Sequence, residues 1–111
     1  MIRIEGKHIT ITRGDCEPFT ITLTGEDVPA DGEKVLFSVK RNADAQSTIF
    51  EKELTVQNSK IAVRIMNADT RNLPFEDYQW DIRFPDYYGN GEPHTPMEPA
   101  CFTIAKVIGN V

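Results

Sequence analysis

The sequence has 111 residues, of which 40% are hydrophobic and 26% are charged, a composition typical of a folded globular domain rather than of a disordered chain. The net charge is −5 and Lys40 with Arg41 is the only adjacent basic pair, so nucleic acid is excluded as an expected partner. No apolar run approaches the roughly 18 residues of a membrane span, which excludes a transmembrane class.

Apolar and polar residues alternate along most of the chain, which is the pattern of half-buried β-strands. In chain order the alternation predicts strands near 2–4, 9–12, 19–24, 35–40, 61–65, 78–84 and 102–104. A weaker segment at 48–54 is expected to form an edge strand or an irregular strand. Turn-forming residues such as Gly, Asp and Asn separate these runs. Short strands at this spacing predict an all-β fold. We expect an immunoglobulin-like antiparallel β-sandwich of about seven to nine strands, formed as a single domain over residues 1–111.

The predicted core consists of the inward residues of these strands: Phe19, Ile21, Leu23, Val35, Phe37, Val39, Ile61, Val63, Ile65, Trp80, Ile82, Phe102 and Ile104. The charges of Glu51, Lys52 and Glu53 are expected to guard the predicted edge strand against aggregation. One helical turn is predicted at 67–73, capped by Asn67 and forming a crossover between the sheets.

A corner precedes the strongest strand, where residues 69–74 are followed by Tyr78 and Trp80. Immunoglobulin-like domains often place a tyrosine near the start of this strand and bond its hydroxyl back to the corner. We expect Tyr78 to take that role. Trp80 is then expected to fill the place where antibody domains carry a bridging cysteine.

Candidate metal ligands are scattered in the sequence. His8 and His94 are the only histidines, and neither has a Cys, His or Asp at the spacing of a known metal motif. The acidic segment 26–33 lacks the spacing of a calcium loop and contains Pro29. We interpret this segment as a solvated hairpin loop, and we expect no metal and no cofactor.

The two cysteines show no sign of reactivity. Cys16 lies between two carboxylates, which disfavour a thiolate, and Cys101 lies in a predicted strand as inert core. No serine occupies a nucleophile elbow, so we expect no catalytic residue and no enzymatic activity. The N-terminal residues alternate like a strand and lack the apolar region of a signal peptide. We therefore expect synthesis in the bacterial cytoplasm and two free thiols.

The segment from Pro85 to Pro99 favours a contact surface. Its candidate partner-contact residues are Tyr87, Tyr88, His94 and Met97. Aromatic residues on a proline-stiffened loop lose little entropy on binding. The alternative is a plain hairpin tip built on Asn90 and Gly91.

Four regions of the chain, namely 12–15 with 19–23, 35–40, 67–74 with 78–82, and 100–104, together carry a resemblance to known proteins. In this order they resemble the N-terminal immunoglobulin-like domain of phage baseplate upper proteins and small prophage structural proteins of similar length. The chain departs from the pattern at Cys16, where threonine is usual, and at 75–77, which replaces a glycine-containing turn.

The resemblance implies a non-enzymatic tail or baseplate component that docks to other phage structural proteins and becomes part of a virion. A homo-oligomer is also compatible with it. The expected docking surfaces are the Pro85–Pro99 loop and strand edges at Ile2–Ile4 and Ile9–Ile11. The alternatives are a bacterial carbohydrate-binding or adhesion module and a sandwich-shaped protease inhibitor.

Overall fold

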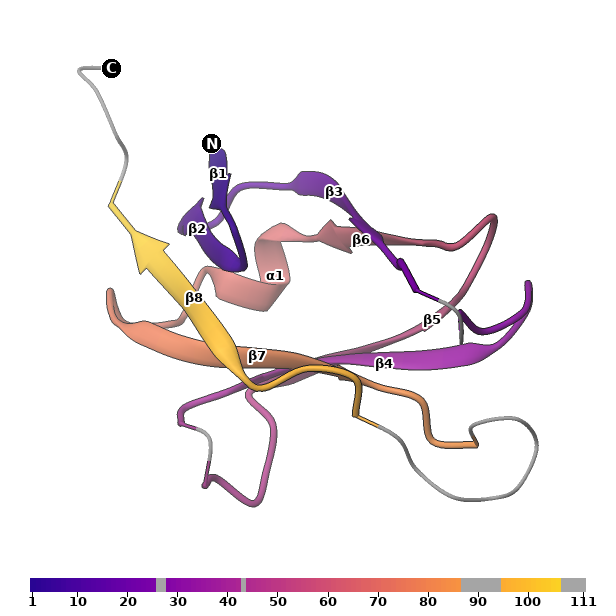
Figure 1. The fold of residues 1–111 in the computed structure, drawn as a ribbon. Helices are drawn as coiled ribbons and strands as arrows, with labels where there is room; N and C mark the ends of the chain where they lie inside the picture. Colours follow the sequence, from indigo (N-terminus) through magenta and orange to yellow (C-terminus); the bar gives the residue numbers. More distant parts are fainter. Residues whose placement is uncertain (26–27, 43, 87–94, 107–111) are drawn as a thin grey trace.

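The computed structural model describes residues 1–25, 28–42, 44–86 and 95–106. Over these residues the chain forms eight strands and one short helix in two layers (Figure 1). The elements are β1 (Ile2–Glu5), β2 (His8–Thr12), β3 (Glu17–Thr22), β4 (Lys34–Lys40), β5 (Phe50–Thr55), β6 (Lys60–Ile65), α1 (Asn67–Thr70), β7 (Asp77–Arg83) and β8 (Ala100–Ala105).

The strands form a six-stranded sheet in the order β1-β2-β8-β7-β4-β5 and a two-stranded sheet of β3 and β6. This arrangement confirms the predicted β-sandwich class, and β5 is an edge strand as predicted. One pairing departs from the antiparallel expectation: β2 lies parallel to β8, with Ile9 opposite Phe102. The β1–β2 hairpin lies at one end of the six-stranded sheet, with β2 beside β8, the last strand of the described chain. After β2 the chain crosses to the other sheet as β3 (Figure 1).

A single cluster of buried side chains fills the space between the sheets. All predicted core residues are buried except Phe19, Ile21 and Leu23, which are half-buried. The core also includes five residues that the prediction left out: Ile9, Ile11, Val56, Tyr78 and Phe84. Phe19 and Ile21 lie in β3, and Leu23 is the residue directly after it. All three lie along the β3 edge of the small sheet, with which no described strand pairs.

The corner before β7 is built as predicted. The Tyr78 hydroxyl donates a hydrogen bond to the Pro74 carbonyl at 3.0 Å, and the ring is completely buried. Trp80 stacks on Phe37 with ring centroids 5.4 Å apart, and its indole N–H donates to the Lys7 carbonyl at 2.9 Å. The Trp80 side chain therefore joins β7 to β4 and to the turn between β1 and β2.

Helix α1 is shorter than predicted and its cap is different. The N-cap residue is Met66, whose N–H donates to the Asp69 carboxylate at 2.8 Å. Asn67 lies inside the helix, and its side-chain amide donates to the Gly14 carbonyl at 2.7 Å. The prediction of an Asn67 cap is wrong because a tertiary partner takes this side chain.

Replacing Tyr78 with phenylalanine is expected to lower the free energy of unfolding by about 1–2 kcal/mol, because the bond to Pro74 is lost. Burial raises the pKa of the Tyr78 phenol, the Glu76 carboxylate raises it further, and Arg41 opposes them. The unfolded chain therefore releases this proton first, so the stability of the wild-type protein should fall as the pH rises above about 10.

Urea denaturation of both proteins at neutral pH and above about pH 10 measures the two effects. The difference in the free energy of unfolding between wild type and Tyr78→Phe should be smaller at the higher pH. Equal stabilities at neutral pH would contradict the role assigned to the corner.

Candidate functional site

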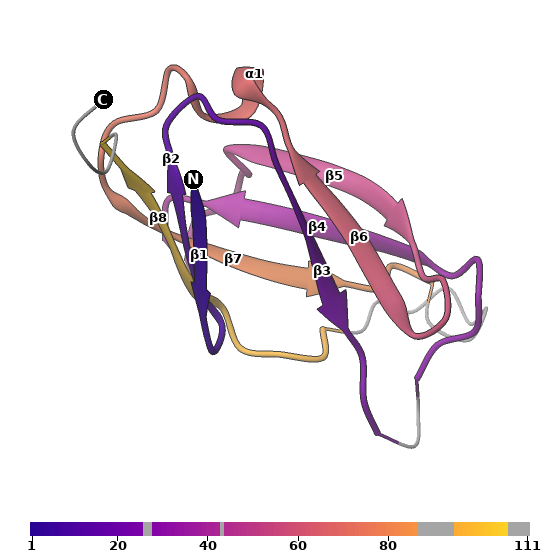
Figure 2. The ribbon, with the colours of Figure 1, turned by 90° about the horizontal axis from the view of Figure 1, so that it is seen from above.

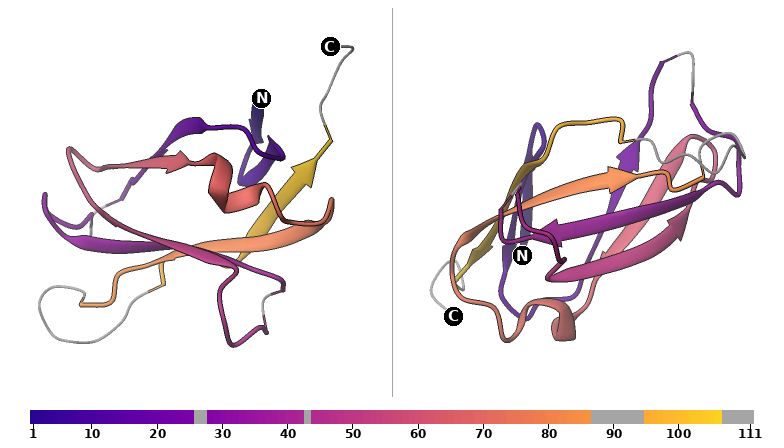
Figure 3. Two further views of the ribbon diagram at one scale, coloured as in Figure 1. Left: turned by 180° about the vertical axis from the view of Figure 1, so that it is seen from behind. Right: turned by 90° about the horizontal axis from the view of Figure 1, so that it is seen from below.

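The outer face of the six-stranded sheet carries polar side chains from the adjacent strands β2, β8 and β7. Figure 3 (right) shows the ribbon of the sandwich from below. On β8, Phe102 and Ile104 point into the core, so Cys101 and Thr103 point outward. Asp77 on β7 lies opposite Thr103, and Ile9 on β2 lies opposite Phe102, which places His8 beside Cys101. Register thus brings His8, Asp77, Cys101 and Thr103 together.

The Thr103 hydroxyl is at the centre of this outer-face cluster. It donates to an Asp77 carboxylate oxygen at 2.6 Å and contacts His8 Nε2 at 2.8 Å and Cys101 Sγ at 3.6 Å. Because the hydroxyl has one proton, which Asp77 accepts, His8 Nε2 acts as the donor in its contact. His8 is thus bonded to a hydroxyl and not to the Cys101 thiol, and a nucleophile–base pair is not formed in this arrangement.

No local sequence motif marks this cluster, since its residues come from three distant segments. The expectation that Cys101 belongs to the core is wrong, because its side chain is only half-buried and lies on the outer face. The expectation of two free thiols is confirmed, and Cys16 is exposed.

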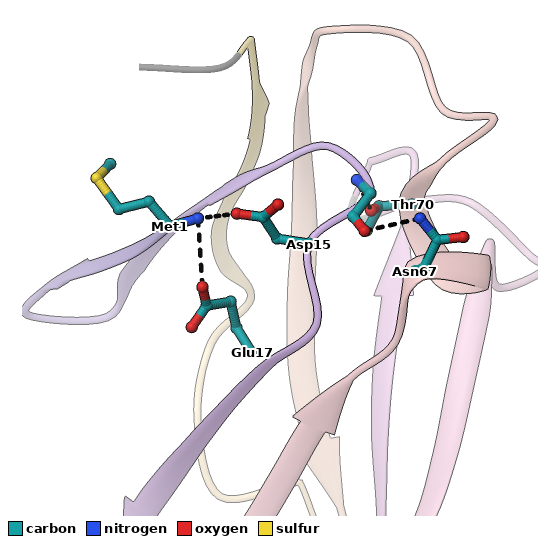
Figure 4. Close-up of polar contacts among 6 residues, drawn as sticks. Met1, Asp15, Glu17, Asn67 and Thr70 are labelled. Atoms are coloured by element: carbon teal, nitrogen blue, oxygen red, sulfur yellow. Dashed lines mark hydrogen bonds and ion pairs between the residues drawn. The ribbon is translucent and has the colours of Figure 1, made fainter. Parts of the chain in front are cut away.

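A second group of polar contacts holds the corner between the two sheets (Figure 4). The Met1 amine forms ion pairs with Asp15 and, at 3.2 Å, with Glu17. The Gly14 N–H donates to the buried Thr70 hydroxyl at 2.8 Å. Gly14 has φ of +85°, a conformation that favours glycine. These groups satisfy one another, so we interpret this corner as structural.

The edges of the sandwich differ in their protection. On β1, Arg3 and Glu5 form an exposed ion pair at 3.0 Å, and on β5 Glu53 pairs with Lys34 at 3.4 Å. Charges of this kind discourage pairing with another strand. In contrast, the second half of β3 consists of Thr20, Ile21 and Thr22 and carries no charged side chain. Among the described residues, no strand pairs with the outer edge of β3.

The backbone of β3 presents hydrogen-bonding groups on that outer side. The Leu23 N–H, just after β3, donates toward the small sheet, to the Ser59 carbonyl at 2.8 Å. Backbone groups alternate in direction along an antiparallel strand, so those of Pro18, Thr20 and Thr22 point away from β6. Pro18 has no N–H to offer, which leaves the Thr20 and Thr22 N–H groups as donors on the free edge.

An apolar recess of about 210 Å³ opens beside this edge and is lined by residues of β3 and of the β1–β2 hairpin and by Trp80. Figure 2 shows the ribbons of β3 and of the hairpin. The lining of the recess includes the apolar side chains of Ile4, Ile9, Phe19, Ile21 and Trp80. Ile4 is among the few large hydrophobic side chains that are exposed. The β3 edge and the recess together are called the β3 groove below.

The predicted contact residues are placed only in part. Met97 is half-buried and packs against the core, so part of its surface is already covered. Tyr87, Tyr88 and His94 lie outside the described residues. Of the predicted docking edges, Ile2–Ile4 lies on the edge strand β1, whereas the prediction for Ile9–Ile11 is wrong because β2 is paired on both sides.

Comparisons of the chain with protein-family models, curated proteins and solved structures found no match. Within the described residues no helix has the length and apolar character needed to cross a membrane. The function is therefore inferred from the surfaces of the chain itself, namely the β3 groove and the outer-face cluster.

Proposed function

We propose that this chain is a non-enzymatic phage or prophage structural protein of the tail or baseplate type that acts by docking to other protein subunits. The observation that carries the docking step is the β3 groove, in which unpaired backbone groups lie beside an apolar recess. The sequence resemblance supplies the phage context.

An extended segment of a partner subunit suits the β3 groove. Its backbone would accept from the Thr20 and Thr22 N–H groups and donate to the outward carbonyls of Pro18, Thr20 and Thr22, which adds a strand to the small sheet. A strand alternates its side chains, so every second residue of the partner faces the sandwich interior. Apolar residues at these positions would enter the recess and cover Ile4, Phe19 and Ile21.

The same step explains why the predicted core residues of β3 are only half-buried. Phe19 and Ile21 face the core but lie at the open side of the sandwich. An added strand would remove more of their apolar surface from water, which contributes about 25 cal/mol for each Å² buried. Symmetric repetition in an assembly would multiply such weak contacts.

Thr20→Pro tests this proposal, because it removes one outward N–H while leaving the bonds between β3 and β6 in place. We expect the variant to fold and to lose at least about tenfold in copurification with the products of neighbouring structural genes. Thr20→Ala is the matched control: it removes the side chain and keeps the N–H, and it should copurify like wild type.

Two outcomes would overturn the docking mode. One is equal copurification of the folded Thr20→Pro variant and wild type. The other is loss of copurification on Tyr87→Ala or Tyr88→Ala alone, which would assign docking to the Pro85–Pro99 loop. Tight binding of a polysaccharide without any phage protein would overturn the whole proposal and favour a carbohydrate-binding module.

A further inference from the structure

We propose that His8, Asp77 and Cys101 form a binding site for one zinc ion on the outer face of the six-stranded sheet. An imidazole nitrogen, a carboxylate oxygen and the thiol sulfur of these residues all lie within 4.8 Å of one another. Each ligand comes from a different strand, namely β2, β7 and β8, and these strands are adjacent in the sheet.

The donor set decides the class of metal. Thiolate, imidazole and carboxylate are ligands that zinc takes in proteins, whereas calcium and magnesium prefer sites made entirely of oxygen. The Cys101 thiolate and the Asp77 carboxylate carry two negative charges, which one divalent cation neutralises. Three protein ligands leave the fourth position of a tetrahedral site to water, and His8 and Asp77 are exposed enough to admit it.

The backbone of the site is held from below by the core. Ile9 follows His8, Tyr78 follows Asp77 and Phe102 follows Cys101, and all three of these neighbours are buried. His8 lies directly opposite Cys101, whereas Asp77 lies opposite Thr103 and therefore diagonal to Cys101. Because the three donor atoms are already within 4.8 Å of one another, modest rotations of the side chains bring them onto one ion.

Thr103 positions these ligands when no metal is bound, through the hydrogen bond to Asp77 and the contact with His8. Zinc takes the place of two protons that face the Thr103 hydroxyl oxygen, one on Cys101 and one on His8. The thiol proton of Cys101 passes to solvent, and the His8 ring exchanges its Nε2 proton for one on Nδ1, which turns the Nε2 lone pair toward the ion. Thr103 can still donate to Asp77 and orient the bound carboxylate.

The metal is not needed for folding, because the core lies on the opposite face of the sheet from the three ligands. The proposed site departs from the sequence-based expectation of no metal, because the three ligands come together only through the order of the strands in the sheet. The site is also separate from the β3 groove, so it can be tested without a partner protein.

Cobalt titration of the tag-free chain, followed by zinc competition, tests the site. We expect one cobalt ion per chain, a near-ultraviolet band from thiolate-to-cobalt charge transfer, and displacement by zinc. Cys101→Ser should abolish the band, and His8→Gln and Asp77→Asn should each weaken binding by at least about tenfold. Cys16→Ser, at the other exposed thiol, is the matched control and should behave like wild type.

The result that would overturn the site is a band that persists in Cys101→Ser and disappears in Cys16→Ser. Wild-type affinity in His8→Gln and in Asp77→Asn would overturn it as well, as would no cobalt binding by the reduced wild-type chain. Thermal unfolding of each variant without metal checks that a lost band does not come from a lost fold.

Discussion

Replacing Trp80 with alanine is expected to lower the free energy of unfolding by about 3–5 kcal/mol, a large share of the stability of a small domain. The indole is only 5% exposed and stacks on Phe37. Its removal leaves a cavity between the sheets and deprives the Lys7 carbonyl of its donor. Urea denaturation followed by circular dichroism measures the loss, since the variant has no tryptophan.

Trp80→Phe is the matched control, because it keeps an aromatic ring against Phe37 and removes only the outer part of the indole and its N–H. Trp80→Phe should lower the free energy of unfolding clearly less than Trp80→Ala does. Native wild-type protein whose tryptophan emission resembles that of free indole in water would contradict the burial of Trp80, and so would an alanine variant of unchanged stability.

Most of the fold can be predicted from the sequence because alternation along a strand directly records which side chains face the core. It identifies the inward residues of β4, β6 and β8 correctly, and those of β7 except Tyr78. Alternation also predicts correctly that the Phe19 and Ile21 side chains face the core, but it does not predict how exposed they remain. Exposure depends on whether another strand covers β3, and this is set by sheet order, which alternation does not contain.

The cap of α1 shows how a tertiary contact overrides a local preference. Asn67 has the chemistry of an N-cap residue, and Met66 does not. The Asn67 amide instead bonds to the Gly14 carbonyl, and the Asp69 carboxylate satisfies the Met66 N–H. The corner that holds Gly14 comes from a distant part of the chain, so local sequence does not predict this exchange.

The outer-face cluster was missed for a related reason. His8 and Cys101 become neighbours through the parallel pairing of β2 with β8, and Asp77 joins them through the pairing of β7 with β8. Metal motifs recognised from sequence depend on ligands at short spacings within one segment. Three ligands on three strands acquire their spacing only when the register is known.

The charges of β5 also have a second role that the sequence did not reveal. Glu51 and Glu53 lie on the outer side of this edge strand, as expected for residues that guard it. Lys52 lies opposite Phe37 and so faces inward. Its ammonium group reaches Asp69 of α1 at 2.7 Å, and both side chains are only 18% exposed. This pair joins the six-stranded sheet to the crossover helix.

Asp69→Asn is therefore expected to lower the free energy of unfolding by about 1–3 kcal/mol, less than for a fully buried pair because water still reaches both groups. The amide oxygen can still accept from the Met66 N–H, so the loss reports mainly on a Lys52 charge left without its partner. Lys52→Met keeps the packing and leaves the Asp69 carboxylate with the Met66 N–H as a donor, so it should lower the free energy of unfolding by less than Asp69→Asn.

Urea denaturation of the two single variants and of the double variant measures the coupling. The double variant should be more stable than the sum of the single losses predicts, because it contains no half-buried unpaired charge. Glu5→Gln, which breaks the exposed pair with Arg3, is the control and should change stability by less than roughly 0.5 kcal/mol. Additive losses at Lys52 and Asp69 would show that the contact between β5 and α1 contributes nothing of its own to the sandwich.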